Sequence, residues 1–340
     1  MALGSDANHG GIVDSVELLI IPAIYLTDFY VKPDWQTGKL DIETAILNST
    51  LKAGQIAIEY TVAPASSGET IQVQHASQEV LPGENRIQVQ LQVANPRLWE
   101  LSDPYLYRIT ARINPEGKDS VHEIFTRFGF RDFRFENGYF RLNGKRLFLK
   151  SSHTGNCYPI SQHRPHDPDL MYRDLLNSKA MGFNMIRFIS GVAWPEQLDY
   201  CDEIGLMVYE ESYAAWCMGN SSQMPQRYNE SVGGMIRRDR NHPCVTIWGL
   251  LNENFGDPVF QHALSQLPFV RSLDDTRMVF LNSGNSDFIG PGIGGLEFWR
   301  VALGGDREKE SRMMEVLNRL KPYSIVGPFE NTGPDGKNSG

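Results

Sequence analysis

A carboxylate at the end of a predicted buried strand is the feature of this sequence best suited to chemistry. The run from Val245 to Trp248 is apolar and β-rich, and Asn252 and Glu253 follow it closely. In a parallel barrel, polar groups at the C-terminal strand ends meet in one bowl, where active sites lie. Burial of Glu253 against Trp248 would raise its pKa, which suits a general acid near neutral pH. The alternative is that the Asn–Glu pair only ends a strand and caps a turn.

The longer stretch DRNHPCVTIWGLLNE, from Asp239 to Glu253, resembles the acid/base signature of glycoside hydrolase family 2. That family contains β-galactosidases, β-glucuronidases and β-mannosidases. The resemblance implies that Glu253 is the proton donor and that Asn252 hydrogen-bonds the sugar 2-hydroxyl. It also places Trp248 among the substrate-binding residues, and it implies no metal and no organic cofactor.

Two further segments and one histidine resemble family patterns at the ends of barrel strands. In GFNMIRF, Asn184 is expected to brace the strand and Arg187 to reach the floor of the sugar site. Without the resemblance, the sequence favours Arg187 as a buried ion-pair partner. LMVYEE places Glu210 or Glu211 near the substrate, and we assign Glu211. His153, after the first barrel strand, is either a substrate contact or an ordinary loop histidine.

The second carboxylate of a glycosidase is harder to identify. Retaining enzymes need two carboxylates about 5 to 5.5 Å apart, one as acid and one as nucleophile. The family places its nucleophile in a phrase like Ser–Glu–Phe–Gly, which this sequence lacks. Glu330 is the nucleophile candidate, although its segment also resembles the opening strand of an accessory sandwich, where it would be a turn residue. Glu297 lies too close in sequence to Glu253 for a seventh strand.

The elements that would position these residues form two predicted domains. Residues 14–131 contain short alternating strands between turns, which predicts an immunoglobulin-like β-sandwich. Residues 132–320 alternate strands with helices, which predicts a (β/α)8 TIM-type barrel. Too few residues follow the fifth strand, ending near Ser283, for three more strand–helix units, so the barrel is expected to be incomplete or abbreviated. Residues 1–13 resemble the remnant of a preceding sandwich, and residues 321–340 form either the last barrel strand or the start of an accessory sandwich.

Composition narrows the classes of partner. The 340 residues carry 32 basic and 41 acidic side chains, a net charge of −9, without a Lys/Arg cluster, so nucleic acid is not an expected partner. No apolar run is long enough to span a membrane. His163 and His166 fall in a loop rich in Pro and Asp and are not expected to bind metal. The four cysteines are scattered and are predicted to be free thiols: Cys157, Cys201, Cys217 and Cys244.

Two hypotheses of function follow. The first is a retaining β-glycosidase that hydrolyses O-glycosidic bonds of β-galactosides, β-glucuronides or β-mannosides, with Glu253 as acid/base. The second is a catalytically incomplete relative that binds carbohydrate or is inactive. The expected partner is a carbohydrate, and a homo-oligomer is compatible with the pattern. The sequence does not identify the sugar or the cellular compartment. The compartment is cytoplasmic, unless the native N-terminus carries a signal, in which case it is periplasmic or extracellular.

Overall fold

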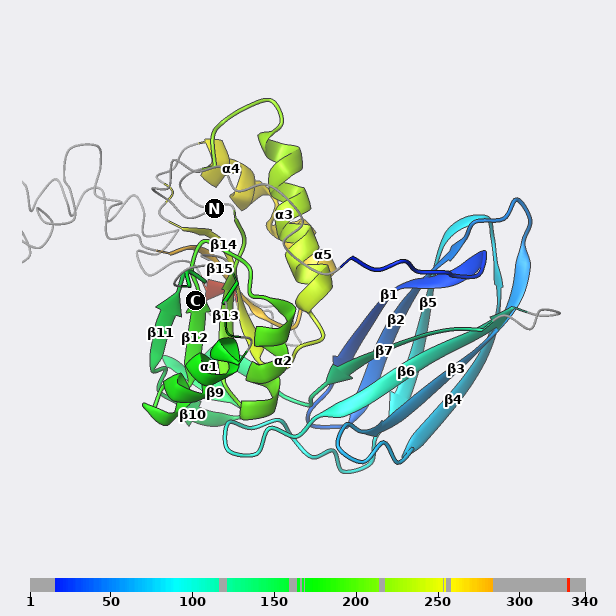
Figure 1. Ribbon diagram of the computed structural model, residues 1–340, viewed down its shortest axis with the longest axis horizontal. Coiled ribbons are helices and arrows are strands. Elements are labelled where there is room, and N and C mark those ends of the chain that lie inside the picture. The colour runs from blue at the N-terminus through cyan, green and yellow to red at the C-terminus, as the bar shows by residue number, and fades with distance from the viewer. Residues whose placement is uncertain are drawn as a thin grey trace, which may run out of the picture.

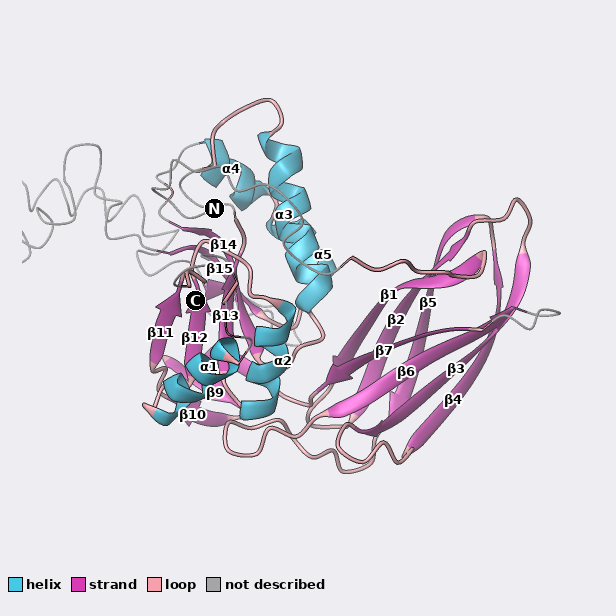
Figure 2. Cartoon of the chain, in the orientation of Figure 1, coloured by secondary structure: helices cyan, strands magenta, loops and turns pink. Residues whose placement is uncertain are grey.

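The structure is a computed structural model that describes residues 16–115, 121–158, 164–165, 167, 169–213, 218–252, 254 and 258–283, with the backbone of 329–330. An all-β domain lies at one end of the molecule and an α/β domain at the other (Figure 1). All described helices belong to the α/β domain (Figure 2). No helix among the described residues is long and apolar enough to cross a membrane.

The first domain is a sandwich of two antiparallel sheets. One sheet has the order β1 (Ile24–Pro33), β2 (Lys39–Asn48), β5 (Gly83–Gln92), and the other β4 (Gln72–Val80), β3 (Gly54–Pro64), β6 (Tyr107–Pro115), β7 (His122–Phe128). Side chains of a strand alternate between its two faces, so every second residue of β3 enters the core. These residues are Ile56, Ile58, Tyr60 and Val62.

A small antiparallel sheet connects the domains. It consists of β8 (Phe133–Glu136), β9 (Tyr139–Leu142) and β10 (Lys145–Leu147). Both of its turns are Asn–Gly pairs with positive φ, a conformation that Asn and Gly adopt most readily. The predicted boundary near Arg131 falls between β7 and β8, and the exact domain limits stay a prediction.

In the second domain, the described residues form five parallel strands with helices between them. Their order along the sheet is β11 (Ser151–Thr154), β12 (Met185–Phe188), β13 (Met207–Glu211), β14 (Val245–Asn252) and β15 (Met278–Ser283). The intervening helices are α1 (Leu170–Ala180), α2 (Pro195–Ile204), α3 (Met224–Asp239), α4 (Pro258–Ser265) and α5 (Leu267–Leu273). Every residue of β13 and β14 is buried, because parallel strands are covered on both faces. The predicted sandwich followed by an incomplete barrel is therefore confirmed.

A sixth strand, β16 (Phe329–Glu330), is the one element described beyond β15. It pairs with β15 in the antiparallel sense, with Glu330 opposite Val279. Strands of a (β/α)8 barrel run parallel. The arrangement of this pair thus differs from that of a regular further barrel strand, which was one of the two predicted identities of residues 321–340.

The sandwich contacts the α/β domain through the segments that lead into β14 and β15. Tyr30 of β1 donates its hydroxyl hydrogen to Asp274 Oδ1 at 2.7 Å, and both residues are buried. Asn241 exchanges two hydrogen bonds with the backbone of β1, and Arg240 forms an ion pair with Asp28. The sandwich therefore holds the segment from which β14 starts.

Candidate active site

Four polar side chains meet at the C-terminal ends of four consecutive parallel strands. They are Arg187 of β12, Glu211 of β13, Asn252 of β14 and Ser283 of β15, and we call them the strand-end cluster. Arg187 Nε donates to Glu211 Oε1 at 2.8 Å. Arg187 Nη2 donates to Asn252 Oδ1 at 2.6 Å and to Ser283 Oγ at 2.5 Å. This is the end of the sheet where parallel barrels carry their active sites.

Glu211 is the buried anchor of this cluster. Its side chain is 1% exposed, and it accepts hydrogen bonds from Arg187, from the backbone N–H of Ser190 at 2.9 Å and from the Ser283 hydroxyl at 2.8 Å. A buried charge is stable only when it is paired and hydrogen-bonded, and Glu211 meets both conditions. The structure therefore gives Glu211 the role of orienting Arg187, while the predicted direct contact with substrate stays a prediction.

Two backbone features make room for Glu211. Ser190 adopts φ +50°, a left-handed conformation uncommon for serine, which accompanies the hydrogen bond from its N–H to the Glu211 carboxylate. A Cβ at Gly249 would lie 2.4 Å from Glu211 Cγ and 2.5 Å from Tyr209 Cε2. Position 249, on the strand next to Glu211, therefore has room only for glycine, because the Glu211 and Tyr209 side chains occupy the space of a Cβ.

Arg187 and Asn252 are the members of the cluster best placed to meet a ligand. The Arg187 side chain is 20% exposed although it is ion-paired, so the ion-pair interpretation is supported, and its predicted contact with the sugar stays a prediction. Asn252 is 3% exposed, and its Oδ1 is occupied by Arg187 and Ser283. Its amide nitrogen has no hydrogen-bond partner among the residues that the structure describes. The cluster can therefore offer N–H donors to an oxygen-rich molecule.

The other predicted site residues lie in different places. His153 is exposed on β11, in register with Arg187 on the adjacent strand, so it flanks the cluster. Glu253, the predicted acid/base, lies outside the described residues, directly after Asn252. The side chain of Glu330 and all of Glu297 also lie outside them.

Trp248 requires a correction. Its side chain is fully buried, and its Nε1 donates to Asp274 Oδ2 at 2.8 Å, where the Tyr30 hydroxyl also binds. The Arg277 guanidinium lies 5.4 Å from the centre of the indole ring. The ring thus packs towards the segment that joins the domains, away from the strand-end cluster, and the structure does not support a sugar contact at Trp248.

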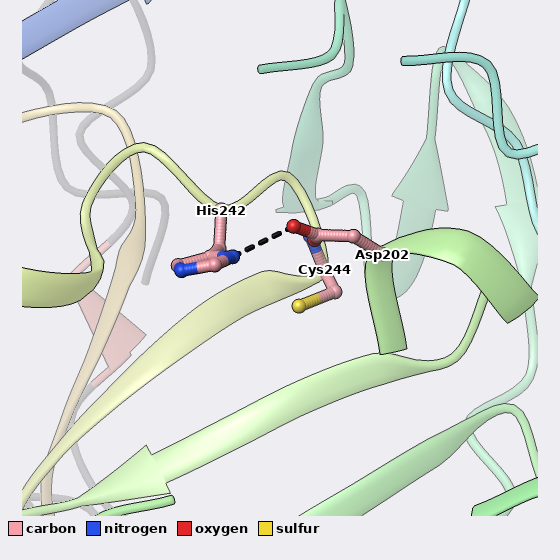
Figure 3. Close-up of side chains that lie close together, drawn as sticks. All are labelled: Asp202, His242 and Cys244. Carbon is pink, nitrogen blue, oxygen red and sulfur yellow. Dashed lines mark hydrogen bonds and ion pairs between the residues drawn. The ribbon is translucent and has the colours of Figure 1, made fainter. Parts of the chain in front are cut away.

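A second cluster of residues with metal-binding types lies at the start of β14 (Figure 3). His242 Nδ1 lies 2.7 Å from Asp202 Oδ2, and the Cys244 N–H donates to Asp202 Oδ1 at 2.9 Å. Burial, followed by the Asp202 charge, raises the pKa of the Cys244 thiol well above its usual value, which favours the protonated form. Both carboxylate oxygens are already bonded, so this cluster connects α2 to β14. Cys157, Cys201 and Cys244 are free thiols as predicted, and Cys217 lies outside the described residues.

Comparison with known proteins gives matches over both domains. The model of "Glycosyl hydrolases family 2" matches residues 24–131, and that of "Glycosyl hydrolases family 2, TIM barrel domain" matches residues 133–290. A β-galactosidase of Pectobacterium atrosepticum is 30% identical over 293 residues, and one of Vibrio cholerae is 28% identical over 292. Each alignment covers 82% of this chain and 28% of the relative, so the chain spans under a third of their length.

Solved structures show the same architecture. A β-glucuronidase of Parabacteroides merdae superposes with a TM-score of 0.65 at 26% identity, covering 76% of this chain and 34% of that one. A β-glucuronidase of Bacteroides uniformis superposes with a TM-score of 0.69 at 20% identity, covering 91% of this chain and 40% of that one. The second likeness, at 20% identity, concerns the fold alone.

Proposed function

Since both domains match models of glycosyl hydrolases family 2, the chain belongs to that family, and we propose that it forms part of a retaining β-glycosidase. The reaction is hydrolysis of the O-glycosidic bond of a β-galactoside, β-glucuronide or β-mannoside. The observation that carries the proposal is the strand-end cluster, which gathers a guanidinium and a carboxamide at the end of the strand that the predicted acid Glu253 follows in the sequence.

In the proposed mechanism, Glu253 protonates the oxygen that leaves the anomeric carbon while a second carboxylate attacks that carbon. Water then hydrolyses the glycosyl–enzyme intermediate, with Glu253 acting as base. Asn252, one residue earlier, would donate its amide N–H to a sugar hydroxyl. We propose Glu330 as the nucleophile candidate, because Glu211 already accepts hydrogen bonds from three donors.

The proposed substrate is a β-galactoside, a β-glucuronide or a β-mannoside. Two relatives matched by sequence are named β-galactosidases, and a structural neighbour at 26% identity is named a β-glucuronidase. Arg187 would suit an anionic or a hydroxyl-rich sugar. Its side chain is 20% exposed, and the ion pair with Glu211 holds the guanidinium in one orientation. A β-galactoside is the first substrate to test.

The second candidate function is carbohydrate binding without turnover. It is favoured by one observation: within the part of the chain that the structure describes, the carboxylate of the strand-end cluster, Glu211, is buried and engaged by the donors Arg187, Ser190 and Ser283. A site with donors and no free second carboxylate can hold a sugar, but it lacks the pair that a retaining mechanism needs.

The deciding experiment measures release of 4-nitrophenol from β-galactoside, β-glucuronide, β-mannoside and β-glucoside substrates. We compare the wild type with Glu253→Gln, and use Glu79→Gln as control, because Glu79 is exposed on β4 in the sandwich. Loss of the general acid should lower turnover by about 10²- to 10⁴-fold, while the control keeps wild-type activity. Undiminished turnover in Glu253→Gln would remove Glu253 from the mechanism.

Two further results of the same assay are informative. Loss of turnover in Glu330→Gln would support Glu330 as nucleophile, and full activity would exclude it. A folded wild-type protein that hydrolyses none of the four substrates, but binds one of the free sugars in calorimetry, would favour the binding function.

A further inference from the structure

Ser283 has no role in the chemistry proposed so far, yet its hydroxyl lies at the centre of the strand-end cluster. Its Oγ is 2.5 Å from Arg187 Nη2, 2.8 Å from Glu211 Oε1 and 2.9 Å from Asn252 Oδ1. Its side chain is 4% exposed. We propose that Ser283 is a positioning residue that fixes the orientation of the Asn252 amide and so turns the NH₂ group toward the sugar. This proposal rests on the proposed function.

The contacts of Asn252 determine which way its amide is turned. A guanidinium can only donate hydrogen bonds, so the Asn252 atom 2.6 Å from Arg187 Nη2 must be the amide oxygen. The Ser283 hydroxyl approaches the same oxygen from β15. With Oδ1 held on both sides, the nitrogen is the end of the amide left for a ligand.

Ser283 is held in turn by charged neighbours. It accepts a hydrogen bond from Arg187, and its one proton is shared among the nearby oxygens of Glu211, Asn252 and, at 3.3 Å, the Leu251 backbone. The backbones of Asn252 and Ser283 are also in register across β14 and β15. Because the Ser283 hydroxyl is already engaged with Arg187, Glu211 and Asn252, it acts on a sugar through Asn252 and not by direct contact.

Removal of the hydroxyl should loosen the amide. The terminal torsion of an asparagine is broad, so the side chain depends on its partners for a single orientation. In Ser283→Ala, the Asn252 oxygen keeps Arg187 alone, while Arg187 and Glu211 keep their own ion pair. The amide then rotates about its one remaining hydrogen bond to Arg187, so its NH₂ group is no longer held in a single direction toward the sugar.

The kinetic test compares Ser283→Ala on 4-nitrophenyl glycosides of one sugar, the parent compound and its monodeoxy analogues. We expect kcat/KM on the parent to fall about tenfold, the equivalent of one hydrogen bond. On the analogue that lacks the hydroxyl bound by Asn252, the loss should nearly vanish. Ser283→Thr, which retains the hydroxyl, should restore activity on the parent. Equal losses on all analogues would overturn the proposal, because a general structural defect does not distinguish them.

Thr246→Val is the matched control. Thr246 is also buried, lies on the same strand as Asn252, and uses its hydroxyl to bond the backbone oxygen of Val208, remote from the cluster. We expect wild-type kcat/KM from this variant. A tenfold loss in Thr246→Val would show that any buried hydroxyl of this sheet has the same effect, which contradicts a specific role of Ser283.

A crystallographic comparison separates this inference from the proposed function. Structures of the wild type and Ser283→Ala, without ligand, should show one orientation of the Asn252 side chain in the first and more than one in the second. An unchanged Asn252 would overturn the inference even in an active enzyme. If instead the wild type hydrolyses no glycoside, the proposed function fails, and the role of Ser283 in the deoxy-analogue test fails with it.

Discussion

Replacing Tyr30 by Phe should weaken the contact between the sandwich and the strand that ends at Asn252. The Tyr30 hydroxyl donates to Asp274 at 2.7 Å, and burial raises the pKa of Tyr30 well above its usual value, so it stays a donor. Burial opposes ionisation of Asp274, but Arg277 and several hydrogen bonds hold its pKa below the usual range. A hydrogen bond to a charged group contributes about 1.5–3 kcal/mol to stability.

The expected cost lies near the middle of that range. Asp274 keeps hydrogen bonds from Thr276, Trp248 and Arg277 in the variant, so no buried charge is left unpaired. The aromatic ring of residue 30 also keeps its contact with Arg240. We therefore expect Tyr30→Phe to lower the free energy of unfolding by about 2 kcal/mol.

Equilibrium unfolding in urea, followed by tryptophan fluorescence, measures this loss. Tyr60→Phe is the matched control, because Tyr60 is buried inside the sandwich and its hydroxyl bonds the neutral Thr44 at 2.9 Å. A neutral hydrogen bond contributes about 1 kcal/mol, so the control should lose about half as much. A loss below about 0.5 kcal/mol in Tyr30→Phe, or one equal to the control, would refute the charge-assisted bond.

The remaining predictions concern single residues. In Gly249→Ala the new Cβ would lie 2.4 Å from Glu211 Cγ. We expect a loss of about 1–3 kcal/mol in urea unfolding, and unchanged stability would contradict this packing. Burial lowers the pKa of His242, but Asp202 raises it more, to above 6.5. The stability this pair adds is present below pH 6.5 and lost as the pH rises through the folded-state pKa. As the pH rises above 6.5, the free energy of unfolding should therefore fall less in His242→Gln than in the wild type. Parallel pH profiles of the two proteins would exclude the effect. Burial raises the pKa of Glu210 well above 4.5, so its contribution is lost as the pH rises beyond that value. The urea midpoint of Glu210→Gln, relative to wild type, should rise between about pH 5 and pH 8, and a constant difference would count against the raised pKa.

Adjacent carboxylates show where sequence reasoning stopped. Glu210 and Glu211 are consecutive in β13, so their side chains point to opposite faces of the sheet. Glu211 meets Arg187, whereas Glu210 accepts the N–H of Ala193 on the other face. The resemblance to the family placed one of them near the substrate, and the contacts of Glu211 put that residue in the strand-end cluster.

Much of the architecture was determined by local features of the sequence. Alternating apolar residues, Asn–Gly turns and the change to strand–helix alternation predict the sandwich and the barrel, because each depends on neighbours a few residues apart. The family signature from Asp239 to Glu253 is local in the same sense. It led to Asn252, and the strand GFNMIRF led to Arg187, which the structure brings together at strand ends.

Only the tertiary structure decided the direction of Trp248 and the place of Ser283. Trp248 lies on β14, where every residue is buried. Both faces of such a strand carry apolar residues, so the sequence does not indicate which face the indole ring occupies. Ser283 is an ordinary serine in the sequence, and it becomes central because the register of β15 against β14 sets it beside Asn252. Such contacts join residues far apart in the chain, and the packing of the strands fixes them where local periodicity does not.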